Sequence, residues 1–272
     1  MIAKRKSMTA LVTGGSSGIG LEYARQLIIK GCTVVIVSNR DSELSDAQAF
    51  LSAEALKARA EGSSECSKVL TLFMDLSVPG CARSLLEWCE GRRLRIDVLI
   101  NNAGMFFMEY LVEESLPKAR TMMNLHVQTV TELCILFGAR MKARGEGYIL
   151  NMSSMTARIP APGIAIYSAS KAYINSFSKG FGHEMRPFGV RVTSVCPAAV
   201  DTGLYKLSPG MRKAGRRLGL IQSPEALVRR ALRALFRGRR TVSPGIMNAL
   251  LPPLIKILPN RLVDRLGRKW MN

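Results

Sequence analysis

The sequence predicts an α/β protein built on a parallel sheet with helices on both faces. Apolar, often β-branched runs of five to seven residues alternate with longer helical segments along the first 200 residues. Such alternation is typical of parallel strands joined by right-handed helical crossovers. A glycine-rich turn follows the first run, and a Tyr-x-x-x-Lys pair stands after the fifth. We therefore expect one domain with a ligand site where these strands end.

The first run, residues 9–13, leads through the glycine-rich turn 14–20 into a helical segment at residues 21–30. Glycines let a backbone approach a pyrophosphate closely, and the following helix N-terminus points unpaired N–H groups and a partial positive charge at it. Strand, turn and helix together favour a phosphate-binding site over a merely tight turn.

The end of the second run, residues 33–37, bears on the choice of cofactor. In a dinucleotide-binding fold, an acid at this place binds the ribose hydroxyls and repels a 2′-phosphate. The chain instead has Ser38, Asn39 and Arg40 before its next acid, Asp41. A guanidinium can pair with a phosphate through charge-assisted hydrogen bonds, so we expect NADP(H). The alternative is that Arg40 is a solvated loop residue.

The remaining elements continue the alternation as far as residue 196. Helices are expected at residues 42–59, 78–89, 116–124 and 126–144, and strands at residues 68–74, 96–100, 148–152 and 190–196. The strands up to residue 152 are therefore separated by helices, with two helices in succession before residues 148–152, as a parallel sheet covered on both faces requires.

Ser154, Tyr167 and Lys171 place a hydroxyl, a phenol and an ammonium where one carbonyl could touch all three. Tyr167 and Lys171 are four residues apart, so on a helix their side chains share a face. Ser154 follows the fifth strand, and strand end and helix start would converge there. Taken alone, the Tyr-x-x-x-Lys pair could also be a half-buried aromatic residue and its solvated neighbour.

In this setting the chain resembles the classical short-chain dehydrogenases/reductases, and the resemblance covers about residues 7 to 205. It rests on residues 13–20 (Thr-Gly-Gly-Ser-Ser-Gly-Ile-Gly), Asp75, residues 101–104 (Asn-Asn-Ala-Gly), Asn124, Ser154, Tyr167, Lys171 and residues 197–202 (Pro-Ala-Ala-Val-Asp-Thr). Ser154, and not Ser153, matches the family's serine because it stands thirteen positions before Tyr167. The branch that it resembles most contains 17β-hydroxysteroid dehydrogenases and long-chain 3-ketoacyl reductases.

The resemblance implies a three-layered α/β/α Rossmann fold with a doubly wound parallel sheet. It also implies hydride transfer between nicotinamide C4 and a carbonyl or alcohol carbon, with Tyr167 as general acid and base. Ser154 would hold the substrate oxygen, and Asn124 would hold a water that links Lys171 to solvent. Lys171 would bind the nicotinamide ribose and favour the phenolate of Tyr167, because a free phenol has a pKa of about 10.

Cofactor contacts are likewise implied at the strand ends. They are Gly14, Ser16, Ser17, Gly18, Ile19, Gly20, Asn39, Arg40, Asp75, Leu76, Asn101, Ala103, Gly104, Tyr167, Lys171, Pro197, Val200 and Thr202. One departure is Ala198, where the family commonly has a glycine after the proline. An alanine still adopts negative φ, so we expect a slightly altered turn and an intact site.

The composition limits which cellular compartment and which binding partners can be expected. The six cysteines form no Cys-x-x-Cys pair and no cluster with the two histidines, so neither a metal site nor a disulfide framework is indicated and a cytoplasmic location is expected. No stretch reaches the roughly 20 apolar residues of a membrane span. The net charge is +19, and residues 203–272 hold 16 of the 39 Lys and Arg but only two of the 20 Asp and Glu.

We therefore divide the chain into three parts. Residues 1–202 would be the NADP-binding catalytic core, residues 203–245 a substrate lid with the last helix and strand of the same domain, and residues 246–272 a basic amphipathic helical tail. The tail pattern suits peripheral contact with an anionic membrane surface, or packing on the domain or a partner subunit. Nucleic acid is disfavoured because few stacking aromatics accompany the basic residues.

The apolar run Met105–Met108 lies just past a strand end, where it can line a pocket for a bulky lipophilic carbonyl such as a steroid or a long-chain 3-keto lipid. It could equally be ordinary core. Two other functions stay open, namely reduction of small polar carbonyls and a catalytically silent binding or scaffold protein. The resemblance also implies self-association, because the family commonly pairs the two helices that here are residues 126–144 and 167–186. Both carry apolar residues on more than one face, so a homodimer or homotetramer is expected.

Overall fold

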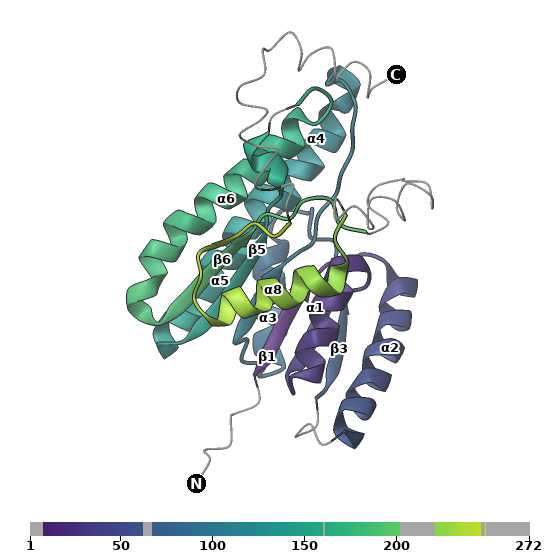
Figure 1. Cartoon of the computed structure of the whole chain (residues 1–272), viewed down its shortest axis with the longest axis vertical. Helices are drawn as coiled ribbons and strands as arrows, with labels where there is room; N and C mark the ends of the chain where they lie inside the picture. The colour runs from purple at the N-terminus through teal and green to yellow at the C-terminus, as the bar shows by residue number, and fades with distance from the viewer. Residues whose placement is uncertain (1–7, 62–66, 160, 202–220, 246–247, 249–272) are drawn as a thin grey trace.

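The computed structural model describes residues 8–61, 67–159, 161–201, 221–245 and 248. Within these residues, seven parallel strands form one sheet in the order β3-β2-β1-β4-β5-β6-β7 (Figure 1). The strands are β1 (Thr9–Thr13), β2 (Thr33–Ser38), β3 (Val69–Phe73), β4 (Val98–Asn101), β5 (Gly147–Met152), β6 (Val190–Val195) and β7 (Thr241–Val242). The chain builds outward from β1 to β3 and then returns to continue from β4, which confirms the doubly wound parallel sheet.

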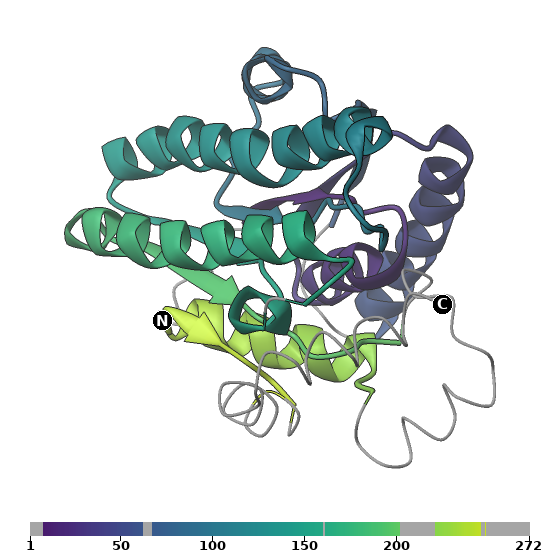
Figure 2. The ribbon, with the colours of Figure 1, turned by 90° about the horizontal axis from the view of Figure 1, so that it is seen from above.

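Helices cover both faces of this sheet (Figure 2). One layer contains α1 (Gly18–Ile29), α2 (Asp41–Ala60) and α8 (Pro224–Phe236), and the other contains α3 (Cys81–Gly91), α5 (Thr129–Arg144) and α6 (Ala165–Met185). Side chains alternate between the two layers along each strand, so that Ala10 and Val12 pack against the first layer while Leu11 packs against the second. This period of two is what a strand buried on both faces requires.

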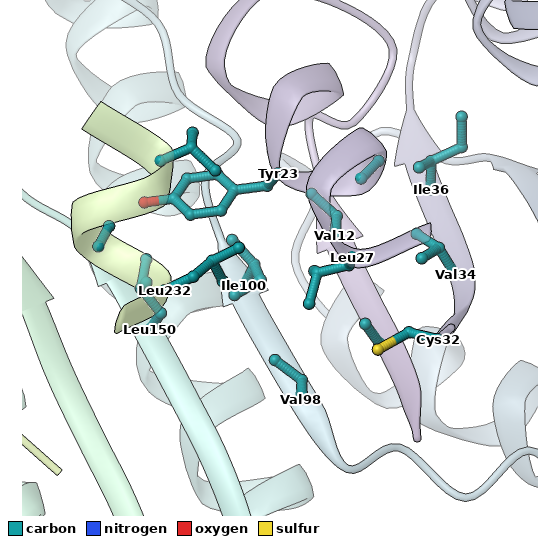
Figure 3. Packing of buried hydrophobic residues seen from close by; sticks show 14 of the residues in the cluster. Val12, Tyr23, Leu27, Cys32, Val34, Ile36, Val98, Ile100, Leu150 and Leu232 are labelled. Atoms are coloured by element: carbon teal, nitrogen blue, oxygen red, sulfur yellow. The ribbon is translucent and has the colours of Figure 1, made fainter. Parts of the chain in front are cut away.

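Beneath the layer of α1, α2 and α8, side chains from the start of the chain pack against side chains from its middle. Figure 3 shows Tyr23 pointing from α1 toward α8, with Ile100 and Leu150 below its ring and Val12 beside it. The Tyr23 hydroxyl is fully buried and donates to Met152 Sδ at 3.3 Å. Burial raises the pKa of this phenol, because the charged form loses its water. The helix that follows the glycine-rich turn is therefore anchored to the end of β5.

The predicted break between two helices near residue 125 takes a different form in the structure. Helix α4 (Leu116–Met123) runs into a single π-helical turn, η2 (Asn124–Gln128), which continues into α5. A π-turn inserts an extra residue into a helix, and such turns occur frequently at functional sites. The chain thus stays helical through Asn124, where we expected one helix to close.

Most of the first predicted part, residues 1–202, is described, and each of the other two parts has residues outside the described ones. The predicted lid, which is the part of residues 203–245 before residue 221, and the basic tail at residues 246–272 except residue 248 lie outside the described residues, so the membrane contact stays a prediction. The predicted last helix and strand of the domain correspond to α8 and β7. Five cysteines, all except Cys66, are described, and each is buried and free. Among the described helices, none is both long and apolar enough to cross a membrane.

Candidate active site

The glycine-rich turn between β1 and α1 forms a tight cradle. Gly14 has a φ of +61° and donates its N–H to Val37 O at 2.8 Å. A Cβ placed on Gly20 would lie 1.9 Å from Gly14 O, so only glycine allows the helix to approach the turn this closely. Ser17 caps α1 without a side-chain hydrogen bond, and the first turn carries no acid. The N–H groups at this helix start therefore suit a phosphate, and the turn fits a dinucleotide.

Thr13 and Asn102, which were not among the predicted contacts, hold this turn against the end of β4. The Thr13 hydroxyl accepts the N–H groups of Asn102 and Ala103, each at 3.0 Å. The Asn102 amide in turn donates to Thr13 O at 3.0 Å and to Gly14 O at 3.1 Å. The doubled asparagine of the motif was the available signal, but it did not say which amide faces the turn.

Asn101 faces the sheet interior and not the turn. Its side chain is buried and donates to Asn151 Oδ1 at 2.8 Å, and Asn151 donates to Ser178 Oγ at 2.9 Å. The two asparagines are register partners on β4 and β5, so their amides join neighbouring strands. The Asn101 side chain therefore joins β4 to β5, and its contact with the cofactor stays a prediction.

A polar cluster lies at the end of β2. The Ser16 hydroxyl lies 2.9 Å from Ser38 Oγ and 3.0 Å from Glu43 Oε2, and Glu43 pairs with Arg40 Nη1 at 2.5 Å. The hydrogen bond from Arg40 is the main reason why the pKa of Glu43 lies below its usual range. Arg40 is two-thirds exposed. Glu43 was missed in the sequence because it stands five residues beyond the end of β2, on α2.

The next strand end presents Asp75 and Leu76. Asp75 is exposed, and its Oδ1 accepts hydrogen bonds from Ser77 N at 2.9 Å and Ser77 Oγ at 2.8 Å. Leu76 is buried, and its carbonyl accepts the Thr129 hydroxyl at 2.8 Å. Because β3, β2 and β1 are neighbours in the sheet, these residues share an edge with Arg40 and the glycine-rich turn.

Lys171 joins α6 to the end of β5. Its Nζ donates to Met152 O at 3.0 Å and lies 5.6 Å from the centre of the Tyr167 ring. Both side chains are about 95% buried. Burial lowers the pKa of the Lys171 ammonium to about 8, so the group is still mostly charged at neutral pH. The structure thus brings a buried cation and a buried phenol together at one strand end.

The two serines after β5 have different partners. Ser153 Oγ donates to the Lys171 carbonyl at 2.7 Å and so holds α6 against the strand. Ser154 caps a short 3₁₀ turn, η3 (Met155–Arg158), and its Oγ accepts the Thr156 N–H at 3.2 Å. Accepting a hydrogen bond does not use the hydroxyl proton, so Ser154 can still donate to a ligand. This geometry favours Ser154 over Ser153 as the substrate contact.

Three more side chains lie at the site. Asn124, half-buried, is the first residue of the π-turn. Phe106 meets Tyr167 edge to face, with 5.0 Å between ring centres. His126, which the sequence reasoning missed, is fully buried beside Tyr167 with ring centres 5.9 Å apart. A lone histidine between helical segments carries no local signal for such a position.

The loop after β6 closes the far side of the site. Pro197 O accepts the Met155 N–H at 2.9 Å, and Val200 forms a parallel bridge with Gln222. Ala198 is buried, and Arg93 is the one non-glycine residue with positive φ among those described. Alanine therefore fits this turn without the left-handed backbone that favours glycine. Thr202 lies outside the described residues.

Comparisons with known proteins point in one direction. A family model described as short chain dehydrogenase matches residues 8–211. The chain is 30% identical to 17-beta-hydroxysteroid dehydrogenase type 3 of Danio rerio over 255 residues, which cover 92% of this chain and 76% of that protein. It is 30% identical to very-long-chain 3-oxoacyl-CoA reductase of Homo sapiens over 256 residues, which cover 92% and 75%.

One solved structure of a known protein is similar to this chain in fold and in sequence. A short-chain dehydrogenase from Sphingobium yanoikuyae in complex with NADPH superimposes with a TM-score of 0.73 at 27% identity, covering 93% of this chain and 96% of that one. The matched family region includes every strand from β1 to β6 and the residues of the candidate site.

Proposed function

The chain belongs to the short-chain dehydrogenase family, and from that premise we propose that it is an NADPH-dependent oxidoreductase. It would reduce a ketone, or oxidise a secondary alcohol, on a bulky lipophilic molecule. The observation that carries the proposal is the hydrogen bond from Lys171 to Met152 O. This bond places Tyr167, one helical turn before Lys171, and Ser154, two residues after Met152, at the same strand end.

The chain's own residues then divide the work. The turn Gly14–Gly20 and the start of α1 would hold the diphosphate of a nicotinamide cofactor, which would supply the hydride when bound. Ser154 donates a hydrogen bond to the substrate oxygen, while Tyr167 gives that oxygen a proton. The ammonium of Lys171 favours the phenolate that remains. Asn124 holds a water through which the proton is replaced from solvent.

The apolar surroundings support a lipophilic substrate. Phe106 packs directly on Tyr167, and the segment that follows it leaves large apolar side chains about half exposed. They are Met108, Tyr110, Leu111, Val112 and Leu116. The relatives named above carry names that refer to a hydroxysteroid and to a very-long-chain 3-oxoacyl-CoA. We propose that the substrate belongs to one of these two chemical classes.

A substrate panel tests this function. The full chain is mixed with NADPH and, separately, a 17-ketosteroid, a long-chain 3-oxoacyl-CoA, 3-ketosphinganine and a small polar ketone, and NADPH absorbance is followed. Turnover of a lipophilic ketone supports the proposal. Turnover of only the small ketone favours the alternative function, which is reduction of small polar carbonyls. NADPH binding without turnover of any of them would indicate a binding protein.

We predict that cofactor preference depends on Arg40. In the intact chain, kcat/KM for NADPH should exceed that for NADH, because the guanidinium is exposed at the end of β2 and can pair with the 2′-phosphate. Arg40→Asp should reverse or erase this preference. Glu43→Gln is the matched control, since it frees Arg40 from its carboxylate partner and should strengthen NADPH binding. Equal kcat/KM for both cofactors in the intact chain would contradict the prediction.

We also predict that the chain self-associates through α5 and α6. Ile135 and Tyr173 are exposed on these helices, and Tyr173, Phe177 and Phe181 form a stack with ring centres 5.8 and 5.4 Å apart. Phe177→Asp should therefore shift a dimer or tetramer to monomer in light scattering, because a buried unpaired charge is costly at an interface. Leu56→Asp, an equally drastic change at an exposed position on α2, should leave the mass unchanged. A monomeric mass for the intact chain would refute the prediction.

A further inference from the structure

His126 is a buried titratable group that the proposed reaction does not use. It lies inside the π-turn with none of its surface exposed. Its Nε2 accepts the Met105 N–H at 3.0 Å. Met105 directly follows residues 101–104, so this bond holds the segment that leaves the end of β4.

The other ring nitrogen reaches the catalytic helix. His126 Nδ1 lies 3.0 Å from Ser170 Oγ, and the Ser170 hydroxyl donates to Tyr167 O at 2.8 Å. A hydroxyl has a single proton. Because Ser170 gives that proton to the Tyr167 carbonyl, Ser170 Oγ accepts from His126 Nδ1–H. Both ring nitrogens therefore require the same neutral tautomer, with the proton on Nδ1 and none on Nε2.

The surroundings keep the imidazole neutral and in place. A Cβ added to Gly104 would lie 3.0 Å from His126 Nε2 and 3.7 Å from Lys171 Nζ, so the ring fills the space between the loop and α6. The titratable groups beside it are Lys171 and Tyr167, both on α6. Burial lowers the pKa of His126 well below 6.5, and the Lys171 ammonium acts in the same direction.

We infer that His126 is a positioning residue that joins the segment after β4 to the catalytic helix through Met105 and Ser170. Its two hydrogen bonds go to Met105 N and Ser170 Oγ, and neither of these is a reacting group. It fixes where Tyr167 stands relative to residues 101–105, which border the proposed cofactor site. The bridge itself is independent of the reaction, whereas its catalytic consequence rests on the proposed function.

The tautomer provides a test that needs no turnover. The chain has two histidines, so ¹⁵N-histidine labelling of the full chain gives two imidazoles, and His183→Gln identifies the signals of His126. We expect a protonated Nδ1 and an unprotonated Nε2 at pH 7, with shifts that stay constant down to about pH 6. An Nε2-protonated or a doubly protonated His126 at pH 7 would overturn the bridge, whatever the enzyme's activity.

Graded substitutions test the positioning role. His126→Phe keeps the ring volume but loses both hydrogen bonds, His126→Asn keeps an amide donor near the Nδ1 position, and His126→Gln keeps an acceptor near the Nε2 position. With NADPH and a 17-ketosteroid or a long-chain 3-oxoacyl-CoA, His126→Phe should lower kcat about 10- to 100-fold, as misplacement of a reacting group does. Asn and Gln should each recover part of this loss, and the Kd for NADPH, measured by fluorescence, should stay within about threefold.

The outcomes separate the inference from the proposed function. An unchanged kcat in His126→Phe, or a parallel loss of kcat, NADPH affinity and thermal stability, would overturn the positioning role. Ser170→Ala breaks the same bridge at its other end, so its effect and that of His126→Phe should be less than additive. If the intact chain reduces none of the ketones, the proposed function fails, and the NMR result alone decides whether the bridge exists.

Discussion

Tyr167→Phe should lower kcat by about 100-fold or more while leaving NADPH affinity nearly unchanged, because a positioned general acid contributes about 10²- to 10⁴-fold. The substitution removes one hydroxyl and keeps the ring that Phe106 and His126 contact. The lost group is then the proton donor and not a packing element. Rate measurements under saturating NADPH and fluorescence titration of NADPH would separate the two quantities.

Tyr173→Phe is the matched control for this experiment. Tyr173 lies on the same helix but is more than one-third exposed and shares a hydrogen bond with Thr131 at 2.8 Å. Its hydroxyl should contribute nothing to kcat. A Tyr167→Phe variant that kept more than about a tenth of the wild-type kcat would show that another group supplies the proton.

Gly20→Ala should abolish tight NADPH binding and destabilise the fold. Its new Cβ would lie 1.9 Å from Gly14 O and 2.5 Å from Asn102 Nδ2. The turn and α1 would have to separate, and overpacking of this kind costs about 1–3 kcal/mol or more. The same separation would disturb the hydrogen bonds from Asn102 to Thr13 O and Gly14 O. Thermal unfolding and NADPH fluorescence titration measure the two effects.

Gly91→Ala is the same chemical change at a place without neighbours. Gly91 is the last residue of α3, and a Cβ there would meet nothing within 4 Å. Because alanine has less conformational entropy to lose than glycine, this variant should gain up to about 1 kcal/mol of stability and bind NADPH normally. If Gly20→Ala behaved like Gly91→Ala, the tight cradle described for the turn would be wrong.

Local patterns in the sequence were sufficient to predict the strands and helices and their order along the chain. Apolar runs such as residues 33–37 and 190–196 show β-branched character, and the intervening segments show helical periodicity, so strands and helices could be assigned to within a few residues. The fold class followed because alternating elements have few ways to pack. The types of residue in the candidate site also followed from the sequence, since Tyr167, Lys171 and Ser154 belong to spaced motifs.

Which way each side chain faces was decided only by tertiary structure. Asn101 and Asn102 are adjacent in the chain, yet strand pairing sends one amide to Asn151 and the other to Gly14 O. Ser153 and Ser154 also differ in their partners. The packing of α6 against β5 brings the Ser153 hydroxyl to Lys171 O, where it donates a hydrogen bond. Alternation along a strand makes such neighbours point to opposite sides, but the pattern alone does not say which side holds the site.

Long-range pairs were equally beyond the sequence. Glu43 reaches Ser16 across 27 positions, and His126 reaches Ser170 across 44. Hydrogen bonds require donor and acceptor within about 3 Å and in a suitable direction. The distance in space between the donor and the acceptor of each pair depends on how α2 and α6 pack against the sheet. Local periodicity in the sequence does not predict that packing. The sequence by itself therefore determined the elements and the chemistry available, whereas helix placement and strand register decided which of those groups meet.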